Sequence, residues 1–354
     1  MLYVGNLREG GNSLDRVVSL RGAGWDVEGI DTWPYRAAGP RLIRSLTSRW
    51  QIGPPVKRLN RDLCARAAQG GYDVVLVDKG TVVWSETMLA LKAGAARNLA
   101  VHYTPDAAFF DNRSREFFRA IPEYDLLVTT KPFECNHYLR AGARELMLIE
   151  QGYGNRIDPA LAAVVPDSLR SEVVFVGHCQ PHYARLLKSA SESLPLKIWG
   201  PGWPEYAARN TWARGVVQGP GLFGPDYARA LGGAKIALGL LSKRVAETTT
   251  TRSFEIPAMG TMLLAERSHD HCRLFEEGRE AEFFDDAEEM IAKARAYLAD
   301  DAARRAVGAA GRARCLRDRY AMGDQIARIT DWLDNNATRS FNNTKPAKPL
   351  RHRP

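Results

Sequence analysis

The sequence contains no apolar run that approaches the roughly twenty residues needed to cross a lipid bilayer. Its five cysteines lie far apart and include no Cys-X-X-Cys motif, which excludes a disulfide-rich secreted fold and is typical of reduced thiols. The chain starts directly with the apolar segment LYVG, which predicts a first strand and no signal peptide. We therefore expect a cytoplasmic protein.

A strong charge on the body of the chain is also absent. The net charge is +8, but residues 339–354 carry five basic residues and no acid, which leaves only +3 for the rest. A nearly neutral body gives no indication of nucleic-acid binding. The composition of residues 335–354 predicts a basic disordered tail.

The chain of 354 residues, 45% of them hydrophobic and 25% charged, is too long for one ordinary core, so we expect two domains. Buried strands alternate with helical segments in both halves, which begin similarly with LYVGN and EVVFVG. A stretch rich in turn residues separates the halves. We predict an α/β fold with two Rossmann-like domains, residues 1–160 and 161–334, that face each other across a ligand-binding cleft.

The segment from residue 235 to 266 carries the strongest chemical signal. It reads as an apolar strand, a polar loop with four threonines, a short helix and another apolar strand. Loops at the carboxyl ends of parallel strands bind ligands, and a helix amino terminus there favours an anion. The charged side chains of the loop and helix include Lys243, Arg244, Glu247, Arg252 and Glu255. On its own, the spacing of the two glutamates favours a capped helix with solvated charges.

The complete string TTTRSFEIPAMG, followed by an apolar strand, by LFEEGREAEFF and by a helix from Asp286, resembles the carboxyl-terminal part of CgeB-like glycosyltransferases. These enzymes have the GT-B fold and are related to family-four (group 1) glycosyltransferases. The resemblance covers residues 173–320 and, more faintly, the first half. It implies transfer of a sugar from a nucleotide diphosphate sugar, with a UDP-sugar preferred, to a hydroxyl acceptor with retention of configuration.

The resemblance also implies roles for individual residues. Glu255 would bind the ribose and Glu247 the hydroxyls of the sugar. The predicted diphosphate ligands are Arg252, Lys243 or Arg244, Thr249, Thr250 and Thr251. Glu247 is followed by TTTT where family-four enzymes usually carry a glycine-rich stretch, which makes its role less secure than that of Glu255.

No pair of carboxylates of the Asp-X-Asp type stands in a context suited to a divalent cation. We therefore expect a metal-independent enzyme with no cofactor, in which cationic side chains and backbone N–H groups stabilise the leaving diphosphate. The segment HDHC (269–272) resembles a zinc motif, but no fourth ligand accompanies it, so we predict no metal site.

Two glycine-containing strand ends complete the predicted donor site. Gly10 and Gly11 follow the first strand and would let the backbone approach a ligand closely. By resemblance such a loop faces the donor phosphates, although the pair alone is typical of a plain tight turn. Gly177 and His178 end the corresponding strand of the second half, and we place both in the donor site.

His102 and Asp106 are the candidates for the acceptor side of the cleft. They belong to a buried strand and the loop behind it, and strand ends of this kind carry site residues. A carboxylate readily acts as a general base, so Asp106, His102 and Glu247 are the predicted catalytic residues. The structural alternatives are a buried, hydrogen-bonded histidine and a helix-capping aspartate.

Residues 36–61 contain seven basic residues and no acid. Leu42, Leu46 and Trp50 recur four residues apart beside the arginines. A basic amphipathic helix with a tryptophan is typical of peripheral contact with an anionic membrane, here the inner face. The pattern fits better a helix that packs this stripe on its own domain and leaves its charges solvated.

Two other functions stay open on the same fold. A nucleotide-sugar 2-epimerase would turn over a UDP-sugar without an acceptor. A catalytically silent sugar-nucleotide-binding or coat-assembly protein would bind without turnover. For a transferase, we expect a glycan, a lipid-linked molecule or a protein as the acceptor.

Overall fold

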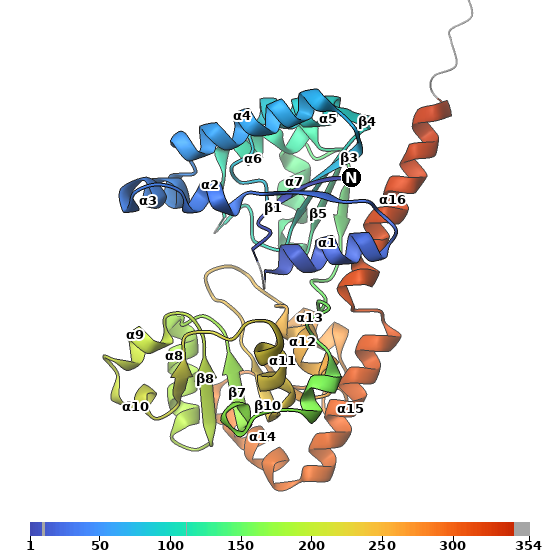
Figure 1. Cartoon of the computed structure of the whole chain (residues 1–354). Coiled ribbons are helices and arrows are strands. Elements are labelled where there is room, and N and C mark those ends of the chain that lie inside the picture. The colour runs from blue at the N-terminus through green and yellow to red at the C-terminus, as the bar shows by residue number, and fades with distance from the viewer. Residues whose placement is uncertain (9–10, 111, 343–354) are drawn as a thin grey trace, which may run out of the picture.

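The structure, a computed structural model, describes residues 1–8, 11–110 and 112–342. It consists of two α/β domains, which lie one above the other in Figure 1. Each domain contains one six-stranded sheet whose neighbouring strands pair in parallel. The predicted fold of two Rossmann-like domains is confirmed.

The first sheet has the strand order β2-β1-β3-β4-β5-β6. Its strands are β1 (Leu2–Gly5), β2 (Glu28–Asp31), β3 (Tyr72–Asp78), β4 (Ala95–Thr104), β5 (Leu126–Thr129) and β6 (Leu146–Leu148). The second sheet has the order β12-β11-β10-β7-β8-β9. Its strands are β7 (Ser171–Val176), β8 (Leu196–Trp199), β9 (Val217–Gly219), β10 (Ala234–Gly239), β11 (Met262–Glu266) and β12 (Glu282–Phe284).

Helices connect the strands in both domains. The first domain contains α1 (Asn12–Gly22), α2 (Trp33–Ala37), α3 (Arg41–Trp50), α4 (Pro54–Gln69), α5 (Ser85–Ala93), α6 (Arg115–Ala120) and α7 (Cys135–Arg140), with short 3-10 turns η1 (Ile121–Glu123) and η2 (Pro132–Glu134). The rest of the chain contains η3 (Pro159–Ala163), η4 (Asp167–Leu169), α8 (Pro181–Ser191), α9 (Trp203–Ala207), α10 (Thr211–Arg214), α11 (Gly224–Gly232), α12 (Arg252–Ala258), α13 (His269–Leu274), α14 (Ala287–Ala299), α15 (Asp301–Arg317) and α16 (Met322–Asn342).

Both faces of the first sheet are covered, so its central strands read as continuous apolar runs. Leu59 of α4 and Met88 of α5 pack on one face. Val17 of α1 and Ile326 of α16 pack on the other face, in the same cluster as Tyr3 of β1. The last helix of the chain therefore belongs to the core of the first domain (Figure 1).

The chain passes between the domains twice, and the two crossings lie side by side. The N–H of Tyr153 donates to the carbonyl of Tyr320 at 3.1 Å, and the N–H of Met322 donates to the carbonyl of Tyr153 at 2.8 Å. Gly152 has a φ of +63°, and a Cβ there would lie 2.6 Å from the oxygen of Tyr320. Glycine is thus required for the close approach of the two crossings.

The domain limits differ slightly from residues 160 and 334. Ile157 and Leu161 pack in the core of the second domain, which therefore begins before residue 161. At the other end α16 continues to Asn342, because a helix that is already nucleated extends at little cost. Residues 343–354 of the predicted tail lie outside the described residues.

Candidate functional site

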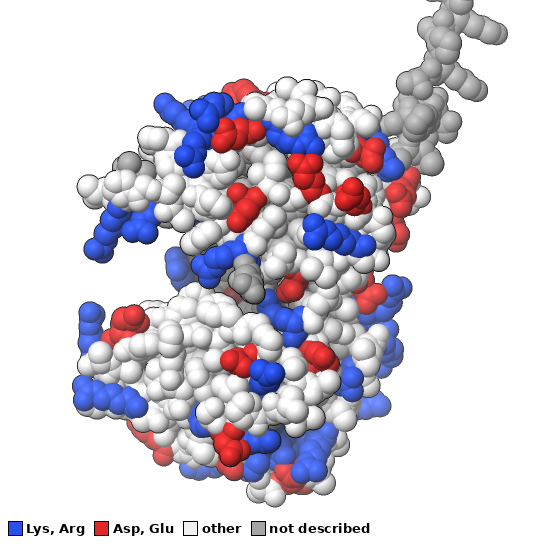
Figure 2. Space-filling view, in the orientation of Figure 1, with Lys and Arg blue, Asp and Glu red and all other residues white. Residues whose placement is uncertain are grey.

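A cleft of about 620 Å³ opens between the two domains and is visible as the hollow between them in Figure 2. A smaller hollow of about 210 Å³ adjoins it on the side of the second domain. The two hollows share Asn12, His178, Phe223, Thr251 and Arg252. They lie beyond the carboxyl ends of β1, β3, β7 and β10, between which the strand order reverses in each sheet. Open α/β sheets bind their ligands at this place.

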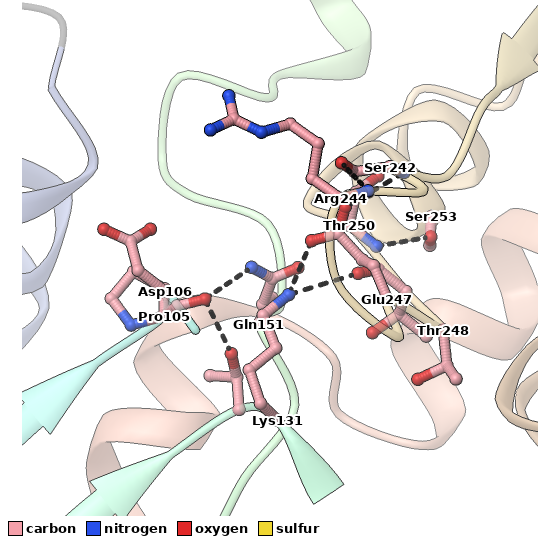
Figure 3. Close-up of polar contacts among 12 residues, drawn as sticks. Pro105, Asp106, Lys131, Gln151, Ser242, Arg244, Glu247, Thr248, Thr250 and Ser253 are labelled. Carbon is pink, nitrogen blue, oxygen red and sulfur yellow. Dashed lines mark hydrogen bonds and ion pairs between the residues drawn. The ribbon is translucent and has the colours of Figure 1, made fainter. Parts of the chain in front are cut away.

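The loop between β10 and α12 is fixed by hydrogen bonds to the end of β11, to α13 and to α12. The N–H of Leu241 donates to Glu266 Oε2 at 2.6 Å, and the hydroxyl of Thr248 donates to Asp270 Oδ2 at 2.6 Å. Within the loop, the N–H of Thr250 donates to Ser253 Oγ at 3.0 Å. Because these partners lie on the side of the second domain, the opposite edge of the loop faces the cleft (Figure 3).

Glu247 lines the cleft and forms an ion pair across it. Its Oε1 lies 2.7 Å from the ammonium of Lys131, which follows β5 of the first domain, and its Oε2 accepts the N–H of Ser242 at 3.3 Å (Figure 3). The side chain of Lys131 is only 4% exposed. The predicted carboxylate is therefore in the cleft, and a buried lysine from the other domain holds it.

Arg252 stands where the two hollows meet. Its guanidinium lies over the ring of Phe175, with 5.5 Å between the guanidinium carbon and the ring centroid, and Nη2 donates to the carbonyl of Leu240 at 3.3 Å. Thr251 and His178 line both hollows beside it. The cleft thus brings together Arg252, Thr250 and Thr251 of the predicted phosphate ligands, with His178 beside them.

Three other predicted phosphate ligands are not brought to the cleft. Lys243 forms an ion pair with Glu266, with 2.9 Å between its ammonium and Oε1. The guanidinium of Arg244 points away from Glu247 in Figure 3, and neither cation lines either hollow. Thr249 is 4% exposed and lines neither hollow, and its carbonyl accepts from the ammonium of Lys131 at 3.5 Å. None of the three side chains is therefore among the residues that line the two hollows, and Lys243 pairs with Glu266 instead.

Glu255 is 1% exposed and lines the smaller hollow. Its Oε1 accepts a bond from Arg156 Nη2 at 2.5 Å, and its Oε2 accepts the hydroxyl of Tyr227 at 2.5 Å. Burial, together with the adjacent Glu255 carboxylate, raises the pKa of Tyr227 well above its ordinary value, so the phenol keeps its proton and donates. Glu255 is thus held in a fixed orientation by two donors, with lone pairs left for a further donor.

A glycine allows the backbone to close around the smaller hollow. Gly200 has a φ of +153°, and a Cβ there would lie 1.8 Å from the carbonyl oxygen of Gly177. No other residue fits this approach of β7 and β8. Gly177 lines the hollow as predicted, and Trp203, which donates its indole N–H to the Gly177 carbonyl at 2.9 Å, is fully buried.

The first domain contributes a charged wall to the cleft. Asp106 lines it and forms an ion pair with Lys79, with 2.6 Å between Oδ2 and the ammonium. Gly11 lines the cleft at the start of α1. Gly10 lies outside the described residues.

His102 is not in the cleft, which corrects its assignment as a catalytic residue. It is 0% exposed, stacks on Phe117 with 4.3 Å between ring centroids, and places Nε2 3.2 Å from the carbonyl oxygen of Lys79. Burial lowers the pKa of His102 to about 4, so the ring is neutral near pH 7. Its position in β4 turns it towards the helices above the sheet, and it is the buried, hydrogen-bonded histidine of the structural alternative.

Several polar residues of the site were not predicted from the sequence. Lys131 follows a buried strand, so the strand-end rule that selected Asp106 could have found it. Arg156 and Tyr227 had no local signal, because their partner Glu255 lies 99 and 28 residues away. A buried pair of Arg16 and Asp78, with 2.6 Å between Nη2 and Oδ2, also lies beside the cleft.

Over residues 1–8, 11–110 and 112–342, no group of three or more His, Cys, Asp or Glu side chains is arranged to hold a metal ion. His271 of the HDHC segment is buried instead. One ring nitrogen lies 2.7 Å from Ser253 Oγ and the other 2.7 Å from the Glu266 carbonyl oxygen. None of the helices in the same described ranges is long and apolar enough to span a membrane.

Solved structures share the fold along nearly the whole chain. HepE from Anabaena, in complex with UDP and glucose, matches with a TM-score of 0.63 at 14% identity, over 95% of this chain and 100% of that chain. Sucrose-phosphate synthase from Thermosynechococcus elongatus matches with 0.64 at 15% identity, over 94% and 99%. A UDP-N-acetylglucosamine 2-epimerase matches with 0.55 at 14% identity, over 99% and 98%. At these identities the likeness shows the fold, which is GT-B.

The second domain also matches a protein family in sequence. A family described as glycosyl transferase-like matches residues 180–331, a range that contains Glu247, Arg252 and Glu255. None of the curated proteins matches the chain in sequence. The resemblance to the CgeB-like subgroup stays a prediction.

Proposed function

We propose that this protein is a glycosyltransferase that moves a sugar from a UDP-sugar to a hydroxyl acceptor, with retention of configuration and without a divalent cation. The match of residues 180–331 to a glycosyl transferase-like family supports the reaction class. HepE, which shares the fold, is described with bound UDP and glucose, and this supports the choice of donor. Retention rests on the resemblance to family-four enzymes.

The main observation behind this proposal is the position of Arg252. This cation stands at the junction of the two hollows, so a nucleoside in the smaller hollow and a sugar in the cleft would leave the diphosphate beside it. The leaving UDP gains negative charge as the glycosidic bond breaks, and a fixed guanidinium stabilises that charge by paired hydrogen bonds. Thr250 and Thr251 supply further polar groups at the same place.

The smaller hollow suits a nucleoside. Phe223 lines it with 60% of the residue exposed, and such a ring can stack on a base. Glu255 lies in the same hollow with its carboxylate oriented by Arg156 and Tyr227, and we assign it to the ribose hydroxyls. Gly200 and Gly177 leave the room that the nucleoside needs.

The acceptor side is assigned to the wall of the first domain. Asp106 lies across the cleft from the donor loop, and a carboxylate there can accept a hydrogen bond from the attacking hydroxyl. Glu247 is assigned to the transferred sugar. The proposed acceptor is a glycan, a lipid-linked molecule or a protein.

The test is a turnover assay with UDP-glucose and UDP-N-acetylglucosamine, run with and without EDTA and with a panel of acceptors. Release of UDP that requires an acceptor and persists in EDTA is the expected result. Conversion of the UDP-sugar to its 2-epimer without an acceptor would instead identify an epimerase. Calorimetric binding of UDP with no turnover under any acceptor would identify a silent binding protein, and loss of activity in EDTA would refute metal independence.

A further inference from the structure

Helix α3 exposes two of the three apolar residues of its predicted stripe, and the side chain of the third, Leu46, lies outside the described part of the structure. Leu42 is 79% exposed and Trp50 is 63% exposed. They are eight positions apart, which is about two helical turns, so they share one side of the helix. The expectation that this stripe packs on its own domain is therefore wrong for these two residues. In Figure 1 the helix projects from the end of the first domain.

The part of the chain that contains these apolar side chains is rich in positive charge. Residues 36–61 contain seven basic residues and no acid, and Arg41 and Arg44 of α3 are exposed. In Figure 2 basic side chains lie beneath the projecting end of the domain, on the side of the cleft. Ile52, just past the helix, adds an apolar side chain that is 59% exposed.

A second segment extends the same surface. The side-chain amide of Gln51, next to the end of α3, donates to the carbonyl of Arg113 at 3.2 Å. Beyond this contact, Arg113, Arg115 and Arg119 line a shallow hollow with Phe118. All three arginines are exposed. Two segments far apart in sequence thus present cations, beside exposed apolar side chains in the first segment and the partly exposed Phe118 in the second.

We propose that this surface, formed by α3, Gln51, Ile52 and the 113–119 segment, docks on an anionic lipid bilayer. Arginines at the level of the headgroups attract anionic lipids, while Leu42, Trp50 and Ile52 enter the boundary between headgroups and acyl chains. A nucleic acid would match the charge but would leave the apolar side chains in water. Docking does not depend on the sugar transfer proposed above.

The surface lies next to the acceptor wall of the cleft. Helix α2 leads into α3, and Arg36 of α2 lines a small hollow together with Asn6 and Lys79. Asn6 and Lys79 also line the main cleft. A bilayer on α3 would therefore hold the acceptor side of the cleft close to the lipid surface.

The experiment is flotation of the full chain with vesicles of phosphatidylcholine alone or mixed with phosphatidylglycerol. We expect binding to the mixed vesicles only, and weaker binding as salt is raised. Each of Arg41→Gln and Arg44→Gln should weaken binding about fivefold, and Leu42→Ser should weaken it as well. The matched controls, Arg295→Gln on α14 and Leu316→Ser on α15, should bind like the unchanged protein.

Trp50 gives a second readout that does not depend on affinity. On anionic vesicles the tryptophan emission should shift to shorter wavelength, and Trp50→Phe should abolish most of that shift. Three results would overturn the proposal: no binding to either vesicle, equal losses in the control variants, or an unchanged emission shift in Trp50→Phe. Binding that disappears only when residues 343–354 are removed would assign it to the tail and overturn the proposal too.

Discussion

The guanidinium of Arg156 lies 2.5 Å from Glu255 Oε1 and connects three parts of the molecule. Arg156 follows the first crossing between the domains, and Glu255 belongs to the second domain. The same guanidinium reaches Asn12 Oδ1 at 2.7 Å and Asp15 Oδ2 at 3.2 Å in α1 of the first domain. One partly buried cation therefore both orients the carboxylate assigned to the ribose and ties the domains together.

Replacing Arg156 should destabilise the protein by leaving a buried carboxylate without its cation. We expect Arg156→Met to lower the free energy of unfolding by about 3 kcal/mol. In a double variant with Glu255→Gln the loss should be much smaller than the sum of the two single losses. Urea denaturation of the three variants measures this coupling, and purely additive losses would show that the ion pair contributes nothing.

The buried pair of Arg16 and Asp78 should be equally sensitive. Asp78 Oδ2 also accepts the hydroxyl of Tyr3 at 2.6 Å, so Arg16→Met leaves a charge that one neutral donor cannot balance. We expect a loss of about 3–5 kcal/mol in the free energy of unfolding. Arg305→Met, which removes an exposed ion pair with Asp301, should change it by less than about 1 kcal/mol. Similar losses in both variants would argue against the buried pair.

The burial of His102 should make the free energy of unfolding depend on pH. In the unfolded chain it takes up a proton as the pH falls through about 6.5, whereas in the folded protein its pKa is about 4. The unfolded state therefore binds more protons between these values, and stability should fall by about 3 kcal/mol as the pH drops across this window. The measurement is urea denaturation at a series of pH values.

Two variants isolate this contribution. His102→Gln should flatten the dependence of stability on pH between about 4 and 6.5. His269→Gln, at a residue whose side chain is 89% exposed, should keep the slope of the unchanged protein. If His102→Gln keeps the same slope, the ring is not a neutral core residue.

Replacing Glu247 should affect binding of the sugar but not binding of the nucleotide. Because it is assigned to the sugar hydroxyls, Glu247→Gln should leave the affinity for UDP nearly unchanged. It should reduce the affinity for UDP-glucose by about 1–2 kcal/mol. Isothermal calorimetry with both ligands measures the difference, with Glu288→Gln on the exposed side of α14 as the control. An equal loss for UDP and UDP-glucose would move Glu247 away from the sugar.

The strands could be predicted because apolar runs such as VVLV and LLVT are specified locally by burial on both faces of a sheet. Strand ends then selected the right loops, and Asp106, Glu247 and Arg252 do line the cleft. Which residue of a loop faces a ligand depends on contacts with other elements. Lys243 forms an ion pair with Glu266 and does not line the cleft. The position of His102 depends on which face of the sheet its residue of β4 points to.

Long-range partners could not be predicted from local patterns. Arg156 contacts residues 99 and 141 positions away, and its own segment shows only turn residues. The basic stripe of α3 shows the converse limit. Its pattern correctly indicated an amphipathic helix. Whether Leu42 and Trp50 are covered depends on which other elements pack against the helix, and the periodicity of one segment gives no information about that.

The most direct test of the account is the affinity of UDP for Arg252→Gln, measured by calorimetry in EDTA. If Arg252 holds the diphosphate, this variant should bind UDP about 1.5–3 kcal/mol more weakly, while Arg295→Gln in the same domain should bind it like the unchanged protein. Circular dichroism confirms that both variants are folded. Undiminished UDP binding in folded Arg252→Gln would contradict the assignment of the cleft as a nucleotide-sugar site.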